Sequence, residues 1–296
     1  MKNILLVGDK WCDGNMSIGE SPTCPNYVKS ISESYGDVVV HSLFYDEAVN
    51  TYGKHIDQVL FEYLTRWPQD IIIFTMMGET PMLPSIQIFE KLYNLKIPVF
   101  LIFSDTGPGW GLQTINSIGD MVSKHVSIDF PSYPYGTPFP KRDNQLYLWT
   151  PMDMSIYFKP EAKDIEVSFV GSLRYGRRQQ ILSIVKDKIQ DLVIVGGQRE
   201  SQFTPENYAS FIRRSKMVIN FADSPAMFHQ TKGRVCETIS TGGLLLESNN
   251  NSTSSLLEKD KEFVTFDTVE ELIEKIQYYK NHPIERDTIA LNGYKA

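Results

Sequence analysis

The segment Lys232–Glu247 reads KGRVCETISTGGLLLE and contains the pattern of a helix, a break and a buried strand. Helical spacing separates a polar face from a face of apolar and small residues. The polar face carries Arg234, Glu237, Thr238 and Thr241, and the other face carries Val235, Cys236, Ile239 and Ser240. Gly242 and Gly243 end this helix, because glycine adopts the left-handed conformation of a helix cap at little cost. The apolar run Leu244–Leu246 then predicts a strand covered on both faces, which is typical of a parallel sheet.

The start of this helix has the chemistry of an anion site. Lys232 and Arg234 place positive charge where the first main-chain N–H groups of a helix are unpaired, and α/β proteins bind phosphate at such positions. Glu237, one turn further on, can accept hydrogen bonds from a pair of sugar hydroxyls. The other interpretation is an ion pair between Arg234 and Glu237 on an ordinary solvent-exposed helix, since pairs at this spacing are common.

The rest of the chain alternates predicted strands and helices, which favours an α/β fold with right-handed crossovers and parallel sheets. Strands are expected at 3–8, 38–42, 70–74, 99–103, 124–129, 166–171, 192–196, 217–221, 244–246 and 263–266. Helices are expected at 22–35, 53–67, 85–95, 177–189, from 205 onward, and at 269–281. Prolines clustered within residues 130–140 interrupt the alternation. We therefore expect two Rossmann-like, doubly wound domains, residues 1–143 and 144–296, that face each other across a cleft.

Composition and charge narrow the class of protein. The chain has 296 residues, of which 42% are hydrophobic and 22% are charged, as in globular proteins. Its formal net charge of −7 gives no general attraction to nucleic acid or anionic membranes. Three cysteines without a CxxC pair and five scattered histidines predict reduced thiols, no metal site and a cytoplasmic protein. The N-terminus reads as a first strand, and no segment reaches the roughly 18 apolar residues of a membrane span.

Several nucleotide and hydrolase motifs are missing from the sequence. It contains no GxGxxG, no GxxxxGK[ST] and no GxSxG, which argues against a nicotinamide dinucleotide, a P-loop NTPase and a serine hydrolase. A second anion-binding turn is instead predicted at Gly171–Arg178 (GSLRYGRR), which follows a strand and opens a helix. Small residues let main-chain N–H groups approach an anion, and arginine neutralises it. Two such turns in one domain suit a diphosphate.

The second half of the chain resembles the C-terminal domain of GT-B glycosyltransferases, in particular the CgeB-like (spore maturation protein) group and its group 1 relatives. FVGSLRYGRR resembles the family's F-x-G strand followed by an arginine, here Arg178. KMVINFADSP resembles its S-x-x-x-x-N strand, with Ser215 and Asn220. KGRVCETISTGGLLLE resembles the R-x-F-E-x-x-x-x-G-G run, with Cys236 in place of phenylalanine, and residues 150–160 resemble the linker. The resemblance covers residues 146–293.

The resemblance implies a nucleotide-diphosphate sugar as donor, most simply a UDP-sugar, and transfer with retention, without a metal or other cofactor. Arg178, Lys232 and Arg234 would hold the diphosphate, and Glu237 would bind the ribose. The rest of the implied donor site comprises Gly171, Ser172, Asn220, Gly242 and Gly243. His229 stands where group 1 relatives have a second glutamate, which marks a departure at the donor sugar.

The first half of the chain is expected to bind the acceptor. Asp105 follows a predicted strand, where a carboxylate can act as a general base or orient an acceptor hydroxyl; alternatively it caps the Asp-Thr-Gly-Pro-Gly turn. Asp9 lies on the loop after the first strand. The sequence leaves the acceptor open between a glycan, a protein, a small molecule and a hydroxymethylated DNA base, as in some phage transferases. A protein that binds a nucleotide sugar without transferring it is a further alternative.

Overall fold

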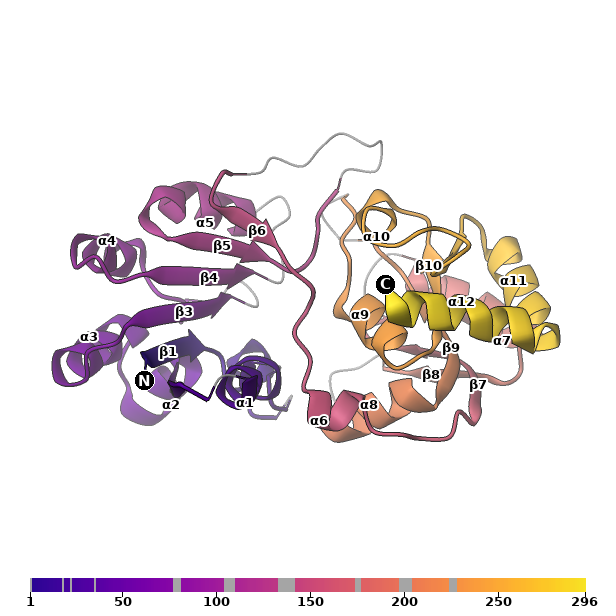
Figure 1. Cartoon of the computed structure of the whole chain (residues 1–296), viewed down its shortest axis with the longest axis horizontal. Helices are drawn as coiled ribbons and strands as arrows, with labels where there is room; N and C mark the ends of the chain where they lie inside the picture. The colour runs from indigo at the N-terminus through magenta and orange to yellow at the C-terminus, as the bar shows by residue number, and fades with distance from the viewer. Residues whose placement is uncertain are drawn as a thin grey trace. The chain divides into compact units, whose positions relative to one another are not determined.

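The computed structural model of the chain describes residues 2–17, 19–21, 23–34, 36–76, 81–103, 110–132, 142–173, 177–196, 204–223 and 228–296, without the side chains of residues 13, 24, 25, 34, 76 and 110–112. The chain divides into two units (Figure 1). Unit 1 comprises residues 1–129 and 140–153, and unit 2 comprises residues 130–139 and 154–296. Each unit has its own sheet and its own hydrophobic core.

Unit 1 contains a six-stranded sheet in the order β2-β1-β3-β4-β5-β6, with every pair parallel. Its strands are β1 (Lys2–Gly8), β2 (Val38–Phe44), β3 (Ile71–Met76), β4 (Val99–Phe103), β5 (Lys124–Ser127) and β6 (Gln145–Tyr147). Its helices are η1 (Cys12–Gly14), the π-helix η2 (Thr23–Lys29), α1 (Ser30–Ser34), α2 (Tyr45–Tyr52), α3 (Ile56–Arg66), α4 (Ile86–Asn94), α5 (Trp110–Ile118) and η3 (Gly119–Met121).

Unit 2 contains a five-stranded parallel sheet in the order β11-β10-β9-β7-β8. Its strands are β7 (Ile165–Val170), β8 (Leu192–Val195), β9 (Ser215–Asn220), β10 (Leu244–Ser248) and β11 (Val264–Phe266). Its helices are α6 (Met154–Tyr157), α7 (Arg178–Lys188), α8 (Pro205–Arg214), α9 (Gly233–Ser240), α10 (Asn251–Ser254), α11 (Val269–Asn281) and α12 (Pro283–Lys295). None of the helices in the described ranges is long and apolar enough to cross a membrane.

The predicted fold class is confirmed: strands and helices alternate, and both sheets are parallel. The sequence placed the change of domain between residues 143 and 144, whereas the contacts place it at Asp153–Met154 and assign 130–139 to unit 2. Among the described elements, one strand and several helices were not predicted, namely β6, α2, α5, α6, α10, α12 and the 3-10 helices η1 and η3. The segment expected as one helix at 22–35 is a π-helix followed by a short α-helix.

The segment 232–247 forms α9 and β10 as predicted, and Gly242 adopts a φ of +68° at the end of the helix. The face taken as polar is nevertheless buried at its centre. Glu237 is 9% exposed and Thr238 is fully buried, because α8 and α12 both pack against α9. The interpretation of Arg234 and Glu237 as an ion pair on a solvent-exposed helix is therefore wrong.

Candidate functional site

Two arginines meet at the carboxyl ends of β7 and β9 in unit 2. Arg178 is the first residue of α7 and is 6% exposed. Its Nη2 donates to the carbonyl oxygens of Phe221 (3.3 Å) and Asp223 (3.0 Å), just beyond β9. Its Nη1 lies 3.4 Å from the carbonyl oxygen of Ser172, just beyond β7. The guanidinium group is therefore fixed between two strand ends.

Arg234, in the first turn of α9, reaches the same two strand ends. Its Nη1 donates to Oδ1 of Asn220, the last residue of β9. Its Cζ lies 4.9 Å from the ring centroid of Phe169, which is within the range of a cation–π interaction. We call this group the arginine corner, and it consists of Gly171, Ser172, Arg178, Asn220, Phe221 and Arg234.

Gly171 is needed for the position of Arg234. It has a φ of +142°, a conformation that side chains rarely allow, and a Cβ atom there would collide with Nη2 of Arg234. Gly196, which follows β8, has a φ of +122°, and a Cβ on it would collide with the carbonyl oxygen of Gly171. The Gly171 N–H donates to the Val195 carbonyl at 2.9 Å. Two glycines thus bring the ends of β7 and β8 close together beneath the arginine.

A buried amide and carboxylate chain continues from Arg234. Because a guanidinium can only donate, Asn220 turns Oδ1 toward Arg234 and donates from Nδ2 to Oε2 of Glu247 at 2.7 Å. The register of β9 and β10 places Asn220 opposite Glu247. Asn250 Nδ2 lies 3.3 Å from the other carboxylate oxygen. Burial raises the pKa of Glu247 to about 8, although the Asn220 bond and the charge of Arg234 oppose this shift.

Glu237 lies in α9 with tyrosines on both carboxylate oxygens. Tyr157 donates to Oε1 at 3.2 Å, and Tyr208 donates to Oε2 at 2.6 Å. Burial raises the pKa of Glu237, and the Tyr208 bond and the positive charge of Arg234 reduce that shift. The residue expected to meet a ribose is therefore already bonded within the protein. Neither tyrosine was singled out in the sequence, because each approaches α9 from a distant segment.

Lys232 and His229 precede α9. Lys232 is the N-cap residue of the helix, and its Nζ donates to Oε1 of Gln230. The main-chain N–H and C=O of His229 pair with those of Ser132 at 2.8 and 2.9 Å. Its Nε2 lies 3.7 Å from Oδ1 of Asp223, and burial lowers its pKa. In the described part of the chain, Nδ1 of His229 is buried without a hydrogen-bond partner.

The remaining predicted residues fall in different places. Gly242 and Gly243 connect α9 to β10, and the Cβ position of Gly243 is 3.3 Å from the carbonyl oxygen of Ser215. Asp105 lies outside the described residues. Asp9 follows β1 in unit 1, is 4% exposed and accepts a hydrogen bond of 2.8 Å from Thr23. The described residues contain no cluster of three or more His, Cys, Asp or Glu side chains that could hold a metal ion.

Comparison with known families matches residues 161–296 to the family described as Glycosyl transferase-like. The matched range contains every residue of the arginine corner. A search of curated proteins found no significant match.

Three of the solved structures similar to this chain are named for a UDP-sugar or were determined with one. Anabaena HepE, solved with UDP-glucose, has 10% identity, a TM-score of 0.61, and coverage of 100% of this chain and 94% of its own. A Listeria monocytogenes protein assigned as a UDP-N-acetylglucosamine 2-epimerase has 10% identity, a TM-score of 0.57, and coverage of 98% and 91%. A DNA-modifying β-glucosyltransferase has 15% identity, a TM-score of 0.53, and coverage of 99% and 93%. At these identities the likeness concerns the fold alone, and it shows that the two α/β units of this chain have the GT-B fold.

Proposed function

We propose that this protein is a glycosyltransferase that moves a sugar from a nucleotide-diphosphate sugar, a UDP-sugar in the first instance, to a hydroxyl group of an acceptor. The observation that carries the proposal is the convergence of Arg178 and Arg234 on the ends of β7 and β9. The match of residues 161–296 to the Glycosyl transferase-like family supports it. The UDP-glucose complex of HepE, whose fold is similar, supports the choice of donor.

In the proposed reaction, the bond between the sugar C1 and the diphosphate oxygen breaks while C1 bonds to the acceptor oxygen. Negative charge grows on the leaving diphosphate, and fixed positive groups stabilise it. Arg178, Arg234 and Lys232 would supply that charge, together with the positive end of the α9 helix dipole. We further propose retention without a metal ion, with the leaving phosphate accepting the proton of the acceptor hydroxyl.

Arg234 has a donor to spare for such a ligand. A guanidinium carries five N–H bonds, and Nε of Arg234 is buried without an acceptor in the described part of the chain. Gly171 and Ser172 would let main-chain groups approach the phosphates.

Tyr157 and Tyr208 occupy two of the roughly four acceptor sites of the Glu237 carboxylate, which leaves sites for the ribose hydroxyls. In the same proposal Asn220 forms the floor of the site, His229 faces the donor sugar, and Gly242 and Gly243 allow close packing behind α9.

Two other functions make different predictions. A DNA glucosyltransferase, suggested by one solved structure of similar fold, would transfer sugar to DNA that carries a hydroxymethylated base and would leave ordinary DNA unchanged. A protein that only binds the nucleotide sugar, suggested by His229 at the position of a family glutamate, would not hydrolyse any donor. Incubation with UDP-, GDP- and ADP-sugars separates these cases, because a transferase slowly releases the diphosphate even without an acceptor.

The proposal is tested by measuring donor hydrolysis and UDP binding in Arg178→Ala and Arg234→Ala. Each substitution removes a fixed charge from the leaving group, so we expect hydrolysis to fall by about 100-fold or more. Arg214→Ala is the matched control, because Arg214 is an exposed residue of α8 paired with Asp164; it should retain wild-type turnover. Circular dichroism and thermal unfolding verify that each variant folds. Near-wild-type hydrolysis in both corner variants would contradict the proposal.

A further inference from the structure

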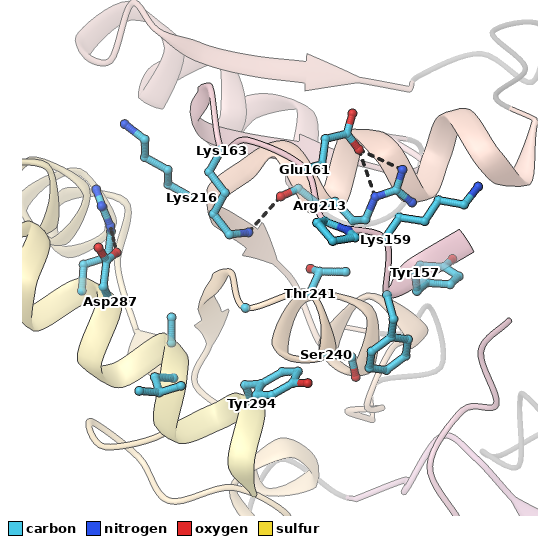
Figure 2. Close-up of a pocket in the computed structure, with 16 residues that line it drawn as sticks. Tyr157, Lys159, Glu161, Lys163, Arg213, Lys216, Ser240, Thr241, Asp287 and Tyr294 are labelled. Atoms are coloured by element: carbon cyan, nitrogen blue, oxygen red, sulfur yellow. Dashed lines mark hydrogen bonds and ion pairs between the residues drawn. The ribbon is translucent and has the colours of Figure 1, made fainter. Parts of the chain in front are cut away.

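A cavity of about 730 Å³ lies in unit 2 at the amino-terminal ends of β7, β9 and β10 (Figure 2). The arginine corner lies at the opposite, carboxyl-terminal ends of the same sheet, so the cavity is a separate site. The segment from Tyr157 to Lys163 forms one wall, the end of α9 forms the floor, and α12 closes the other side. The function proposed above makes no use of this cavity.

The lining of the cavity is rich in positive charge. Five cationic side chains line it, against two acidic ones. The cationic residues are Lys159, Lys163, Arg213, Lys216 and Arg286, and the acidic residues are Glu161 and Asp287. The two arginines are each 6% exposed and are held by ion pairs, Arg213 with Glu161 and Arg286 with Asp287. These arginines form fixed parts of the wall.

Lys163 has an unused hydrogen-bond donor in the cavity wall. Its ammonium group donates to the carbonyl oxygens of Arg213 and Ser215, at 2.9 Å each. An ammonium group has three N–H bonds, so among the described residues these bonds leave one for a ligand. Burial lowers the pKa of Lys163 to about 8, which keeps it mostly charged at neutral pH. In Figure 2 its side chain extends toward Thr241, at the floor of the cavity.

Apolar side chains line the mouth of the cavity and are partly open to solvent. Leu291 and Tyr294 of α12 line the cavity and are 49% and 52% exposed. Phe158, on the other side, is 40% exposed. Large apolar side chains that remain exposed beside a polar pocket are typical of a ligand site.

We propose that this cavity binds an organic anion, a carboxylate or phosphate monoester joined to an aromatic or branched apolar body. The anionic group would accept the third N–H bond of Lys163, and the apolar body would lie against Leu291, Tyr294 and Phe158. An inorganic anion alone would leave the apolar side chains exposed to water. A neutral apolar compound would leave the third N–H of Lys163 without an acceptor. The inference does not depend on glycosyl transfer.

The experiment titrates the full chain with phenyl phosphate, inorganic phosphate and benzyl alcohol by calorimetry. We expect saturable binding of phenyl phosphate, with inorganic phosphate and benzyl alcohol each at least about tenfold weaker. The same titration with Arg178→Ala should give an unchanged affinity for phenyl phosphate, because that residue lies at the other end of the sheet and donates to carbonyl oxygens there. No binding of phenyl phosphate, or equal binding of inorganic phosphate, would overturn the proposal, as would loss of binding in Arg178→Ala.

Charge substitutions on the exposed wall locate the binding site. Leu291→Asp should weaken the binding of phenyl phosphate by about tenfold, because a like charge near the anion in a partly buried site costs at least that much affinity. Leu291→Lys should not weaken it. Ile284→Asp is the control, because Ile284 is on α12, is 84% exposed and does not line the cavity. Lys163→Met should also weaken binding by about tenfold. Equal affinities for Leu291→Asp and the wild type would contradict the assignment.

Discussion

Arg234 is positioned by three neighbours that differ in chemistry. Asn220 accepts a hydrogen bond from its guanidinium, the ring of Phe169 lies beneath it, and Gly171 leaves room for it. A lysine could not reproduce this arrangement, because its ammonium is a compact charge without a planar fork. The position of this cation therefore depends on residues that do not themselves carry charge.

Gly171→Ala is predicted to lower both stability and donor hydrolysis. Its φ of +142° strains any side chain, at a cost of about 1–3 kcal/mol in the free energy of unfolding, and its Cβ would displace Arg234. We expect hydrolysis to fall at least about tenfold. Gly53→Ala is the control, since Gly53 also has a positive φ, +60°, but nothing lies within 4 Å of its Cβ position; it should lower stability alone. Wild-type hydrolysis in Gly171→Ala would count against the role of the corner.

Glu247 makes stability depend on pH. Its pKa is raised to about 8 in the folded protein and is about 4.3 in an unfolded chain, so the folded state retains a proton that the unfolded state loses. Its contribution is complete below about pH 4.3 and is lost as pH rises through 8, with a slope of up to about 1.4 kcal/mol per pH unit. We expect Glu247→Gln to flatten the fall in stability between pH 5 and 8, as measured by urea unfolding.

The control for this experiment is Glu258→Gln, because Glu258 is exposed and pairs with Lys261 at the surface. It should retain the wild-type pH dependence. A Glu247→Gln profile that is parallel to the wild type would show that Glu247 is already ionised at neutral pH.

For single residues, the sequence predicts which side chains carry charge better than it predicts which are buried. Arg178, Arg234 and Glu237 were all predicted as site residues, but the helical spacing placed Glu237 on a polar, solvent-facing side of its helix. The structure buries this carboxylate because Tyr157 and Tyr208 reach it from other segments. Spacing within one helix carries no information on such distant partners, and Glu247 was missed for the same reason.

Among the elements, those with local start signals were predicted well. Thr204 caps α8 by accepting from the Asn207 N–H, with proline at the first helical position, and Thr268 caps α11 by accepting from the Glu271 N–H. The start of α12 carries only part of this signal, since it has Pro283 in the first turn but no side chain that caps the helix. The π-helix η2 has no such signal, because nothing in local periodicity distinguishes an added residue per turn from an α-helix.

The cap of α11 provides a test of these local signals. Thr268→Ala removes the acceptor for the Glu271 N–H, which lies 3.1 Å from Oγ1, and should lower the free energy of unfolding by about 1 kcal/mol. Thr268→Ser retains the hydroxyl and should be close to the wild type. Chemical denaturation of the three proteins compares them. Equal losses for alanine and serine would show that the methyl group, and not the hydrogen bond, stabilises this end of the helix.

At the scale of the whole molecule, the proposal assigns the nucleotide to unit 2. Binding of UDP should slow amide hydrogen exchange in peptides that cover the end of β7, the end of β9 and the start of α9. Peptides from α11 and from β4 serve as internal references, because neither element contributes a residue to the arginine corner. Protection confined to unit 1 would place the nucleotide elsewhere.

Net charge gives a second prediction for the whole chain. With a formal charge of −7, the protein should bind ordinary duplex DNA more weakly than about 100 μM at physiological salt, because non-specific affinity comes from contacts of Lys and Arg with phosphate. Filter binding over a range of salt concentrations measures this. Micromolar affinity with a steep salt dependence would instead favour a nucleic-acid acceptor.

Tyr157 contacts both sites of unit 2, because it lines the cavity and its hydroxyl donates a hydrogen bond to Glu237. Glu237 in turn bonds Tyr208, whose hydroxyl also interacts with Arg234. An occupant of the cavity that draws this hydroxyl away would alter the grip on a nucleotide at the far end of the sheet. A bound nucleotide would then change the affinity of the cavity for its ligand by the same factor, because coupling between two binding sites is reciprocal. Under the proposed function, the hydroxyl of Tyr157 would in that case link the affinity for a nucleotide sugar to the presence of an organic anion in the cavity.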